Sequence, residues 1–257
     1  MTVEVTDGTA GPQRVRWVHA WPVVLRPTGP RRVHLVHAAG GPLGGDDLAL
    51  AVEIGAGAEL AVHSAGATLV QPGAAGSAAR WAVSARVAAG GRLHWAPEPT
   101  VVADGAALDS SLRVELGAGA AATVRETVVL GRHGQRGGRH TGALEVVVEG
   151  VPLLVHTTVL DGADPALCGP AGTGGARAVG TLVCAGAESL PDRAGPTSGE
   201  TGTVRWAWPA LEGPGAVLLA VGTPSAVAAV LDVAAARIAA RVAGAPGAGA
   251  ARLGAPV

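Results

Sequence analysis

The sequence has few side chains at the spacings that catalysis requires. It contains no Gly-x-Ser-x-Gly motif, no phosphate-binding loop and no His-Glu-x-x-His motif. Ser64, Ser110 and Ser111 have no base near them in the chain, so we expect them in turns or on strand surfaces. The acidic residues are scattered at spacings that specify no acid/base pair. We therefore predict no catalytic residue and no enzymatic activity.

Possible metal ligands are more numerous, but their spacing specifies no tight site. His34 and His37 are three residues apart, which places them on opposite faces of a strand. The two cysteines form no Cys-x-x-Cys motif, so no structural zinc site is indicated. His133 and His140 flank an Arg/Gly-rich segment, where they could meet a transient metal or an anion, or lie in a solvated turn.

Asp46 and Asp47 follow two glycines and precede an apolar strand pattern. They could act as paired carboxylates. An aspartate at such a place more often accepts a hydrogen bond from its own turn. Both interpretations stay open at the level of the sequence.

Composition and charge exclude several kinds of partner. Arginine supplies all 19 basic residues, and the net charge of -1 with a pI near 6.7 argues against a nucleic-acid-binding surface. The most apolar stretch, residues 215–245, is interrupted by a proline and three charged residues, so no membrane span is expected. The first ten residues lack the basic and apolar regions of a secretory signal. These features predict a cytoplasmic protein with no nucleic-acid or membrane partner.

Short strands separated by glycine-rich turns recur along the chain. Val52-Glu-Ile-Gly-Ala-Gly-Ala58 nearly matches Val114-Glu-Leu-Gly-Ala-Gly-Ala120, and a weaker copy lies between them. Aligning Ile54, Val87 and Leu116 gives a unit of about 30 residues, which must stack on its neighbours to cover its apolar face. The alternative is a chance match in a chain rich in Ala and Gly. The repeat predicts a mainly β fold, a stacked, β-helix-like superhelix of short strands with glycine turns.

One segment has helical periodicity, over residues 225–243. Ser225 can act as its N-cap, and Gly244 and Pro246 end it. Its apolar stripe, which covers the chain's own sheet or docks a helical partner, consists of Val227, Leu231, Ala234, Ile238 and Val242. We predict a single domain over residues 1–257, with strands between 15 and 222, this small C-terminal helical part and a flexible tail over 247–257.

Three motifs follow one another in a fixed order: Gly40-Gly-Pro-Leu-Gly-Gly-Asp-Asp-Leu-Ala-Leu50, Leu93-His-Trp-Ala-Pro-Glu-Pro99 and Glu126-Thr-Val-Val-Leu-Gly-Arg132. In order and spacing they resemble the urease accessory protein family UreD, also called UreH. The resemblance covers residues 22–162. The positions that match the family motifs are Gly44, Gly45, Asp46, Thr68, Trp95, Pro97, Pro99, Glu126, Gly131 and Arg132.

The chain departs from the family pattern in two places. Gly66 stands where the family has the first Ala of an Ala-Ala-Thr strand, and Gly137-Gly138 stands where Gly-Glu is usual. The role of that acidic residue therefore does not carry over to this chain.

The resemblance implies a non-enzymatic maturation factor with an all-β stacked fold. Members of the family bind apo-urease and assemble with the accessory proteins UreF and UreG, the latter a GTPase that carries nickel. The resemblance further implies GTP-dependent insertion of nickel into urease, an internal route for Ni(II), and no tightly bound cofactor. A route that releases nickel should bind it weakly through oxygen and imidazole donors. Asp46 and Glu126 are the candidate residues for this transient binding.

Two other classes of function stay open. A β-solenoid polysaccharide lyase or hydrolase would need closely placed carboxylates or a basic residue in an aromatic-lined groove, and a chain without Tyr or Phe is poorly suited to stack sugars. A homo-oligomeric β scaffold without a metal role is the second alternative. Co-purification with urease subunits would separate the maturation factor from both.

Overall fold

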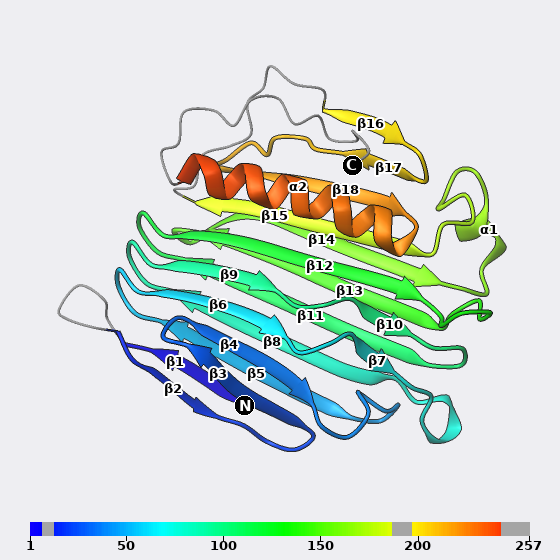
Figure 1. Cartoon of the computed structure of the whole chain (residues 1–257), viewed down its shortest axis with the longest axis horizontal. Helices are drawn as coiled ribbons and strands as arrows, with labels where there is room; N and C mark the ends of the chain where they lie inside the picture. Colours follow the sequence, from blue (N-terminus) through cyan, green and yellow to red (C-terminus); the bar gives the residue numbers. More distant parts are fainter. Residues whose placement is uncertain (7–12, 187–196, 243–257) are drawn as a thin grey trace.

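Two facing β-sheets make up most of the computed structural model, which describes residues 1–6, 13–186 and 197–242 (Figure 1). Sheet A has seven strands in the order β14-β13-β11-β8-β5-β1-β2. Its strands are β1 (Thr2–Val5), β2 (Val15–Val18), β5 (Asp47–Ile54), β8 (Ala79–Val87), β11 (Ala107–Leu116), β13 (Arg139–Val148) and β14 (Val151–Asp161).

Sheet B has eleven strands, nine of them in the order β16-β17-β18-β15-β12-β9-β6-β4-β3, while β7 and β10 pair beside this path. Its strands are β3 (Val23–Gly29), β4 (Arg32–His37), β6 (Glu59–Ser64), β7 (Thr68–Val70), β9 (Arg92–Ala96), β10 (Thr100–Val102), β12 (Ala121–Leu130), β15 (Ala178–Gly186), β16 (Ser198–Thr201), β17 (Val204–Ala207) and β18 (Gly215–Gly222).

The chain alternates between the two sheets, which makes the centre of the fold a β-solenoid. In sheet A, β5, β8, β11 and β13 pair in parallel. In sheet B, β4, β6, β9 and β12 do the same. Each circuit of the chain therefore adds a strand to both sheets, and the predicted mainly β, stacked architecture with a C-terminal helix is confirmed.

The repeat read from the sequence is the register of sheet A. Ile54 pairs with Val87, and Val87 pairs with Leu116, as the alignment of the three copies predicts. The ladder continues from Leu116 to Val148, a fourth copy that the sequence comparison did not include. The four aligned apolar residues therefore lie side by side on the same face of sheet A.

Glycines at equivalent corners turn the chain. Gly57, Gly90 and Gly119 have φ values of 60°, 66° and 65°, the left-handed region that glycine adopts without strain. Each of these tight turns carries the chain from sheet A to sheet B. A tight hairpin between paired strands lies at Glu149-Gly150, where both residues have positive φ and β13 pairs with β14.

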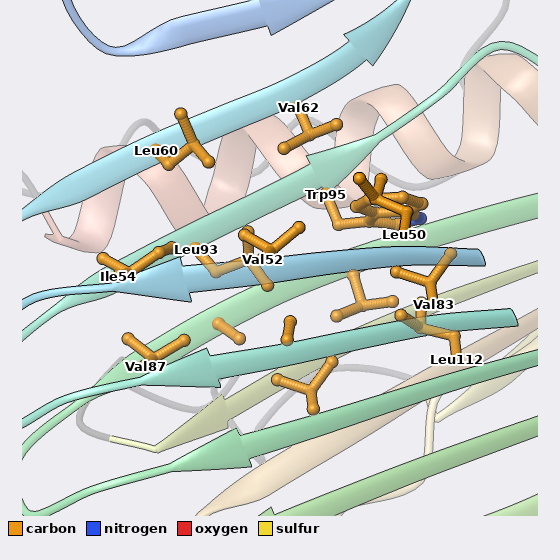
Figure 2. Packing of buried hydrophobic residues seen from close by; sticks show 14 of the residues in the cluster. Leu50, Val52, Ile54, Leu60, Val62, Val83, Val87, Leu93, Trp95 and Leu112 are labelled. Atoms are coloured by element: carbon orange, nitrogen blue, oxygen red, sulfur yellow. The ribbon is translucent and has the colours of Figure 1, made fainter. Parts of the chain in front are cut away.

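Every second residue along each strand points inward, and these inward-facing residues form the core between the sheets. Figure 2 shows Leu60, Val62, Leu93 and Trp95 of sheet B together with residues of sheet A. The sheet A residues labelled there are Leu50, Val52, Ile54, Val83, Val87 and Leu112. Side chains from both sheets pack against one another in this core, and their packing fixes the distance between the sheets. Polar groups that lie between the sheets are therefore held in fixed positions.

Helix α2 (Pro224–Val242) lies across the outer face of sheet B, against β12, β15 and β18 (Figure 1). Val227, Leu231 and Ile238 are buried there, so the stripe covers the chain's own sheet. Gly180 of β15 permits this close approach, because a Cβ there would lie 2.5 Å from a methyl group of Val227. The remaining helices are short: α1 (Pro165–Cys168) and a 3-10 turn (Ala74–Gly76).

The start of α2 differs from the prediction. The helix begins at Pro224, and the Thr223 hydroxyl accepts a hydrogen bond from the Ala226 N–H at 3.4 Å, so Thr223 replaces Ser225 as the cap. Proline favours the first helical position because its missing N–H would have no partner there. The predicted tail over 247–257 lies outside the described residues, as does the side chain of Val242. Neither α1 nor α2, the α-helices of the described part, has the length and apolarity that a membrane crossing requires.

Candidate functional site

An internal cavity of about 80 Å³ lies between the two sheets; we call it the chamber. Both sheets contribute imidazole and hydroxyl side chains to its wall, beside apolar residues of the core, and sheet B adds the carboxyl group of Glu126. The residues that line it are Leu35, His37, Pro42, Thr68, Trp81, Trp95, Pro97, Glu98, Thr100, Leu108, Ser110, Glu126, Thr127, Val128, His140, Gly142, Leu144, His156, Thr158, Val179 and Thr181.

The chamber extends across the strands, along the direction in which the solenoid grows. Its wall includes residues of β4, β9, β12 and β15 in sheet B, and of β8, β11, β13 and β14 in sheet A. β4 and β15 are four strand positions apart in sheet B. At the usual strand spacing this corresponds to about 19 Å. The chamber is therefore narrow and elongated rather than a single round pocket.

Glu126 supplies a carboxyl group to the sheet B wall. Alternation along β12 places it on the same inner face as Ala122 and Val124, which belong to the core between the sheets. Burial raises the pKa of its carboxyl from 4.5 to about 7. No described residue forms an ion pair or hydrogen bond with that carboxyl. Glu126 is thus poised to gain or lose a proton near neutral pH, and a cation in the chamber would favour the charged form.

His140 and Ser110 face the chamber from sheet A. The Ser110 Oγ and His140 Nε2 atoms are 3.0 Å apart, and the imidazole is 5% exposed. Burial lowers the pKa of His140 to about 4, an effect that Asp109 partly opposes. Gly142 lies opposite Ser110 in the register, and a Cβ on it would come 2.6 Å from the His140 ring. The missing side chain of Gly142 leaves the room in which the histidine and serine meet.

His37 faces the chamber from sheet B. Its Nε2 lies 3.1 Å from the Thr68 hydroxyl, and its ring centroid lies 6.0 Å from that of Trp81 in sheet A. Burial lowers the pKa of His37 as well. The imidazoles of His37 and His140 are consequently neutral at pH 7, which leaves each ring one nitrogen able to accept a hydrogen bond or bind a metal.

Three buried nitrogen atoms of the chamber wall have no partner within the described protein: Nδ1 of His37, Nδ1 of His140 and Nε1 of Trp95. Buried polar atoms are nearly always hydrogen-bonded, and an unpartnered one costs about 1–3 kcal/mol. A cavity of this volume has room for several water molecules. The polar wall therefore requires water or a hydrated ion to satisfy it.

The predicted site residues separate into two groups. Glu126, Thr68, Trp95 and Pro97 line the chamber. Asp46 instead closes a turn, where its carboxylate accepts a hydrogen bond from the Leu43 N–H at 2.9 Å. Whether either acidic residue touches nickel stays a prediction.

The remaining motif positions lie outside the chamber wall, and several of them allow close contacts between backbone segments. A Cβ at Gly44 would lie 2.2 Å from the Ser77 carbonyl oxygen, and Gly45 has a φ of 98°. Gly131 also has positive φ and packs against Gly137, while the Arg132 N–H donates to Gln135. Pro99 lines a second hollow of about 470 Å³ together with Gly131 and Arg132. These residues shape the loops at the end of the strands.

Sequence reasoning missed the sheet A wall. The expectation of a strand-surface position is correct for Ser111 but wrong for Ser110, which lies inside and contacts His140. His140 is buried on β13 and not in a solvated turn, whereas His133 is exposed. His37 and His34 do lie on opposite faces, as predicted, because His37 lines the chamber and His34 stacks on His63 of the next parallel strand. The alternation of β4 was the available signal for His37.

No group of three or more His, Cys, Asp or Glu side chains in the described residues is arranged to hold a metal ion. The chamber thus offers donors one or two at a time.

Comparison with known proteins gives one consistent family. A family model described as UreD urease accessory protein matches residues 5–252. Among similar proteins, the urease accessory protein UreD of Frankia alni is 44% identical over 167 residues, which cover 59% of this chain and 56% of that protein. The corresponding protein of Frankia casuarinae is 43% identical over 168 residues, covering 62% and 53%. That of Streptomyces avermitilis is 43% identical over 167 residues, covering 63% and 66%. The chain spans about half to two thirds of the length of these relatives.

Proposed function

The chain belongs to the UreD urease accessory protein family, and on that premise we propose that it assists urease maturation by letting Ni(II) pass through the chamber between its sheets. In this role it binds apo-urease in the cytoplasm, together with UreF and the nickel-carrying GTPase UreG. GTP hydrolysis belongs to the partner, and nickel is the cargo of this chain rather than a resident cofactor.

The polar chamber is the observation that carries this proposal. A core between two sheets is normally apolar, yet among the described residues this one contains an unpaired carboxyl group, two imidazoles whose Nδ1 atoms have no partner, and an unpartnered indole N–H. Each of these groups costs stability where it stands. Their positions along the solenoid suit an ion that moves between the two sheets, since oxygen and imidazole donors bind divalent nickel and release it.

A carbohydrate-active enzyme fits the two hollows poorly. The chamber, at about 80 Å³, is well below the roughly 300–1,000 Å³ of pockets for organic ligands. The second hollow is larger, but its described lining contains Pro99, Arg132, His133, Arg177 and apolar residues without a carboxylate. Glycoside hydrolysis generally needs two carboxyl groups flanking the bond that is cleaved. The size of one hollow and the chemistry of the other therefore favour an ion over a sugar.

Blocking the chamber is the direct test of the proposal. Ser110→Leu places an apolar side chain in the wall between Leu108 and Leu112, which point to the same face of β11. Ser111→Leu, on the exposed face of the same strand, is the matched control. In cells that express urease with its accessory proteins, we expect both variants to co-purify with urease. We expect only Ser110→Leu to lower the nickel content and activity of the urease, by about tenfold or more where the blocked chamber raises the barrier to nickel passage by about 1.4 kcal/mol.

Two results would contradict the proposal in different ways. Equal nickel contents with Ser110→Leu and Ser111→Leu would show that nickel does not pass through the chamber. Failure of the unmodified chain to co-purify with urease would instead favour a β scaffold without a role in maturation.

Asp46 is a further proposed nickel contact, and its charge can be separated from its turn. Asn at this position keeps an oxygen that can accept from the Leu43 N–H, whereas Ala removes it. If the charge matters, Asp46→Asn lowers the nickel content of urease while the fold stays intact. If the turn alone matters, Asp46→Asn is normal and Asp46→Ala loses about 1 kcal/mol of unfolding free energy. Nickel analysis of co-purified urease and chemical denaturation distinguish the two.

A further inference from the structure

Every histidine that lines the chamber is held in the same way. Nε2 of His37 lies 3.1 Å from the Thr68 hydroxyl, Nε2 of His140 lies 3.0 Å from Ser110, and Nε2 of His156 lies 3.0 Å from the Thr158 hydroxyl. The three pairs come from different strands and both sheets. In each ring one nitrogen is fixed by a hydroxyl group, and Nδ1 is the atom left for another partner.

The hydroxyl groups permit the tautomer in which Nδ1 can bind a metal. A serine or threonine oxygen can accept a hydrogen bond from an Nε2–H, and the neutral ring then has its lone pair on Nδ1. For His37 and His140, Nδ1 is buried and has no partner in the described protein. Since burial keeps these two rings neutral at pH 7, their lone pairs are available without the loss of a proton.

The three rings lie at successive positions rather than at one point. His37 is on β4 near one end of sheet B, while His140 and His156 are on β13 and β14 at the end of sheet A. β13 lies against β15, which is four strand positions from β4. No three acidic, cysteine or histidine residues of the described chain converge on a point where they could hold a metal. One ion can therefore meet these imidazoles only in turn.

Gly142 shows that the local backbone is adapted to the His140 ring. A Cβ at this position would lie 2.6 Å from Cε1 of His140 and 3.2 Å from its Nε2. Glycine in a strand interior costs stability, because it has more conformational freedom to lose than other residues. The ring orientation is thus maintained at a structural cost.

We propose that His37, His140 and His156 form a relay of single-imidazole binding positions, each of which holds a divalent transition-metal ion, Ni(II) in the proposed function, through Nδ1. Water completes the coordination at each position. Ser110, Thr68 and Thr158 act as positioning residues that hold the Nδ1 atoms toward the ion, and Gly142 makes room for the central ring. The inference rests on the proposed function for the identity of the ion, but not for the binding itself.

Nuclear magnetic resonance of the imidazole nitrogens tests the relay in the purified chain. We expect His37 and His140 of the metal-free protein to show protonated Nε2 and unprotonated Nδ1. Addition of Zn(II), a diamagnetic probe with the same preference for imidazole, should shift the Nδ1 signals of the three chamber histidines. Substoichiometric Ni(II) should broaden the same signals through its unpaired electrons.

The positioning residues give a second readout. Ser110→Ala leaves His140 in place without its hydroxyl partner, and we expect its Nδ1 to lose affinity for Zn(II) by about tenfold or more. Ser110→Thr keeps a hydroxyl and should restore binding, whereas Ser111→Ala on the exposed face should change nothing. Unaltered affinity in Ser110→Ala would refute the positioning role.

The outcomes separate the relay from the proposed function. Zn(II) or Ni(II) signals confined to histidines outside the chamber, such as the outer-face His34 and His63, would overturn the relay. A folded triple variant with His37→Asn, His140→Asn and His156→Asn that still activates urease fully would also overturn the relay. The proposed function would stand in that case. Metal binding at the three Nδ1 atoms in a chain that fails to co-purify with urease would support the relay and contradict the proposed function.

Discussion

Leu231→Asp is expected to abolish the soluble, folded protein. Leu231 is fully buried between α2 and sheet B, where its side chain lies over Gly180. Loss of a buried leucine side chain costs about 2–5 kcal/mol, and an unpaired carboxylate in the same place costs several more. Domains of this kind have a total stability of roughly 5–15 kcal/mol. The substitution therefore removes most or all of the free energy of unfolding.

The matched control is Ala236→Asp, which introduces the same charge on the exposed face of α2. We expect it to cost only about 0.5–0.7 kcal/mol, the difference in helix propensity between Ala and Asp. Soluble yield, circular dichroism and urea denaturation compare the two variants. Similar stabilities would show that the stripe of α2 does not form part of the core.

Glu126→Gln is expected to stabilise the protein above pH 7. The folded state raises the pKa of Glu126 to about 7, so the folded protein holds this proton more tightly than the unfolded chain does. The associated stability is fully present below pH 4.5 and is lost as the pH rises to 7. A shift from 4.5 to 7 corresponds to about 3 kcal/mol. Gln is neutral at every pH and avoids this loss.

His140 produces the opposite trend. Its pKa in the folded state is lowered from 6.5 to about 4, so its contribution is present above pH 6.5 and is lost as the pH falls toward 4. Between pH 4.5 and 6.5 the two groups offset one another in the unmodified protein. Glu126→Gln should therefore expose a loss of stability toward acid pH, and His140→Asn a loss toward alkaline pH.

Urea denaturation between pH 4.5 and 8 measures both trends. Glu149→Gln, an exposed carboxyl group in the β13–β14 turn, serves as the control and should follow the unmodified protein. Parallel pH profiles for Glu126→Gln and the unmodified chain would show that the Glu126 carboxyl is not held in its neutral form by burial.

Local signals in the sequence were sufficient for the framework of the solenoid. The alternation of inward and outward residues and the glycines at the corners depend only on the local backbone of each unit. Aligning Ile54, Val87 and Leu116 therefore gave the register of the strands directly. The same local periodicity identified the buried stripe of α2. The start of the helix was missed because both Thr223 and Ser225 can cap, and only the backbone geometry chooses between them.

The wall of the chamber was decided by tertiary structure. Ser110 and His140 are 30 residues apart in the chain, and the parallel register of β11 and β13 brings them together. Their contact also depends on the absence of a side chain at Gly142, a residue with no functional signal of its own. Glu126 could be found by its motif, but its raised pKa depends on the second sheet that covers it. The sequence by itself determined which residues face inward, while the pairing of distant strands determined which of them meet, because register is a property of the assembled sheets.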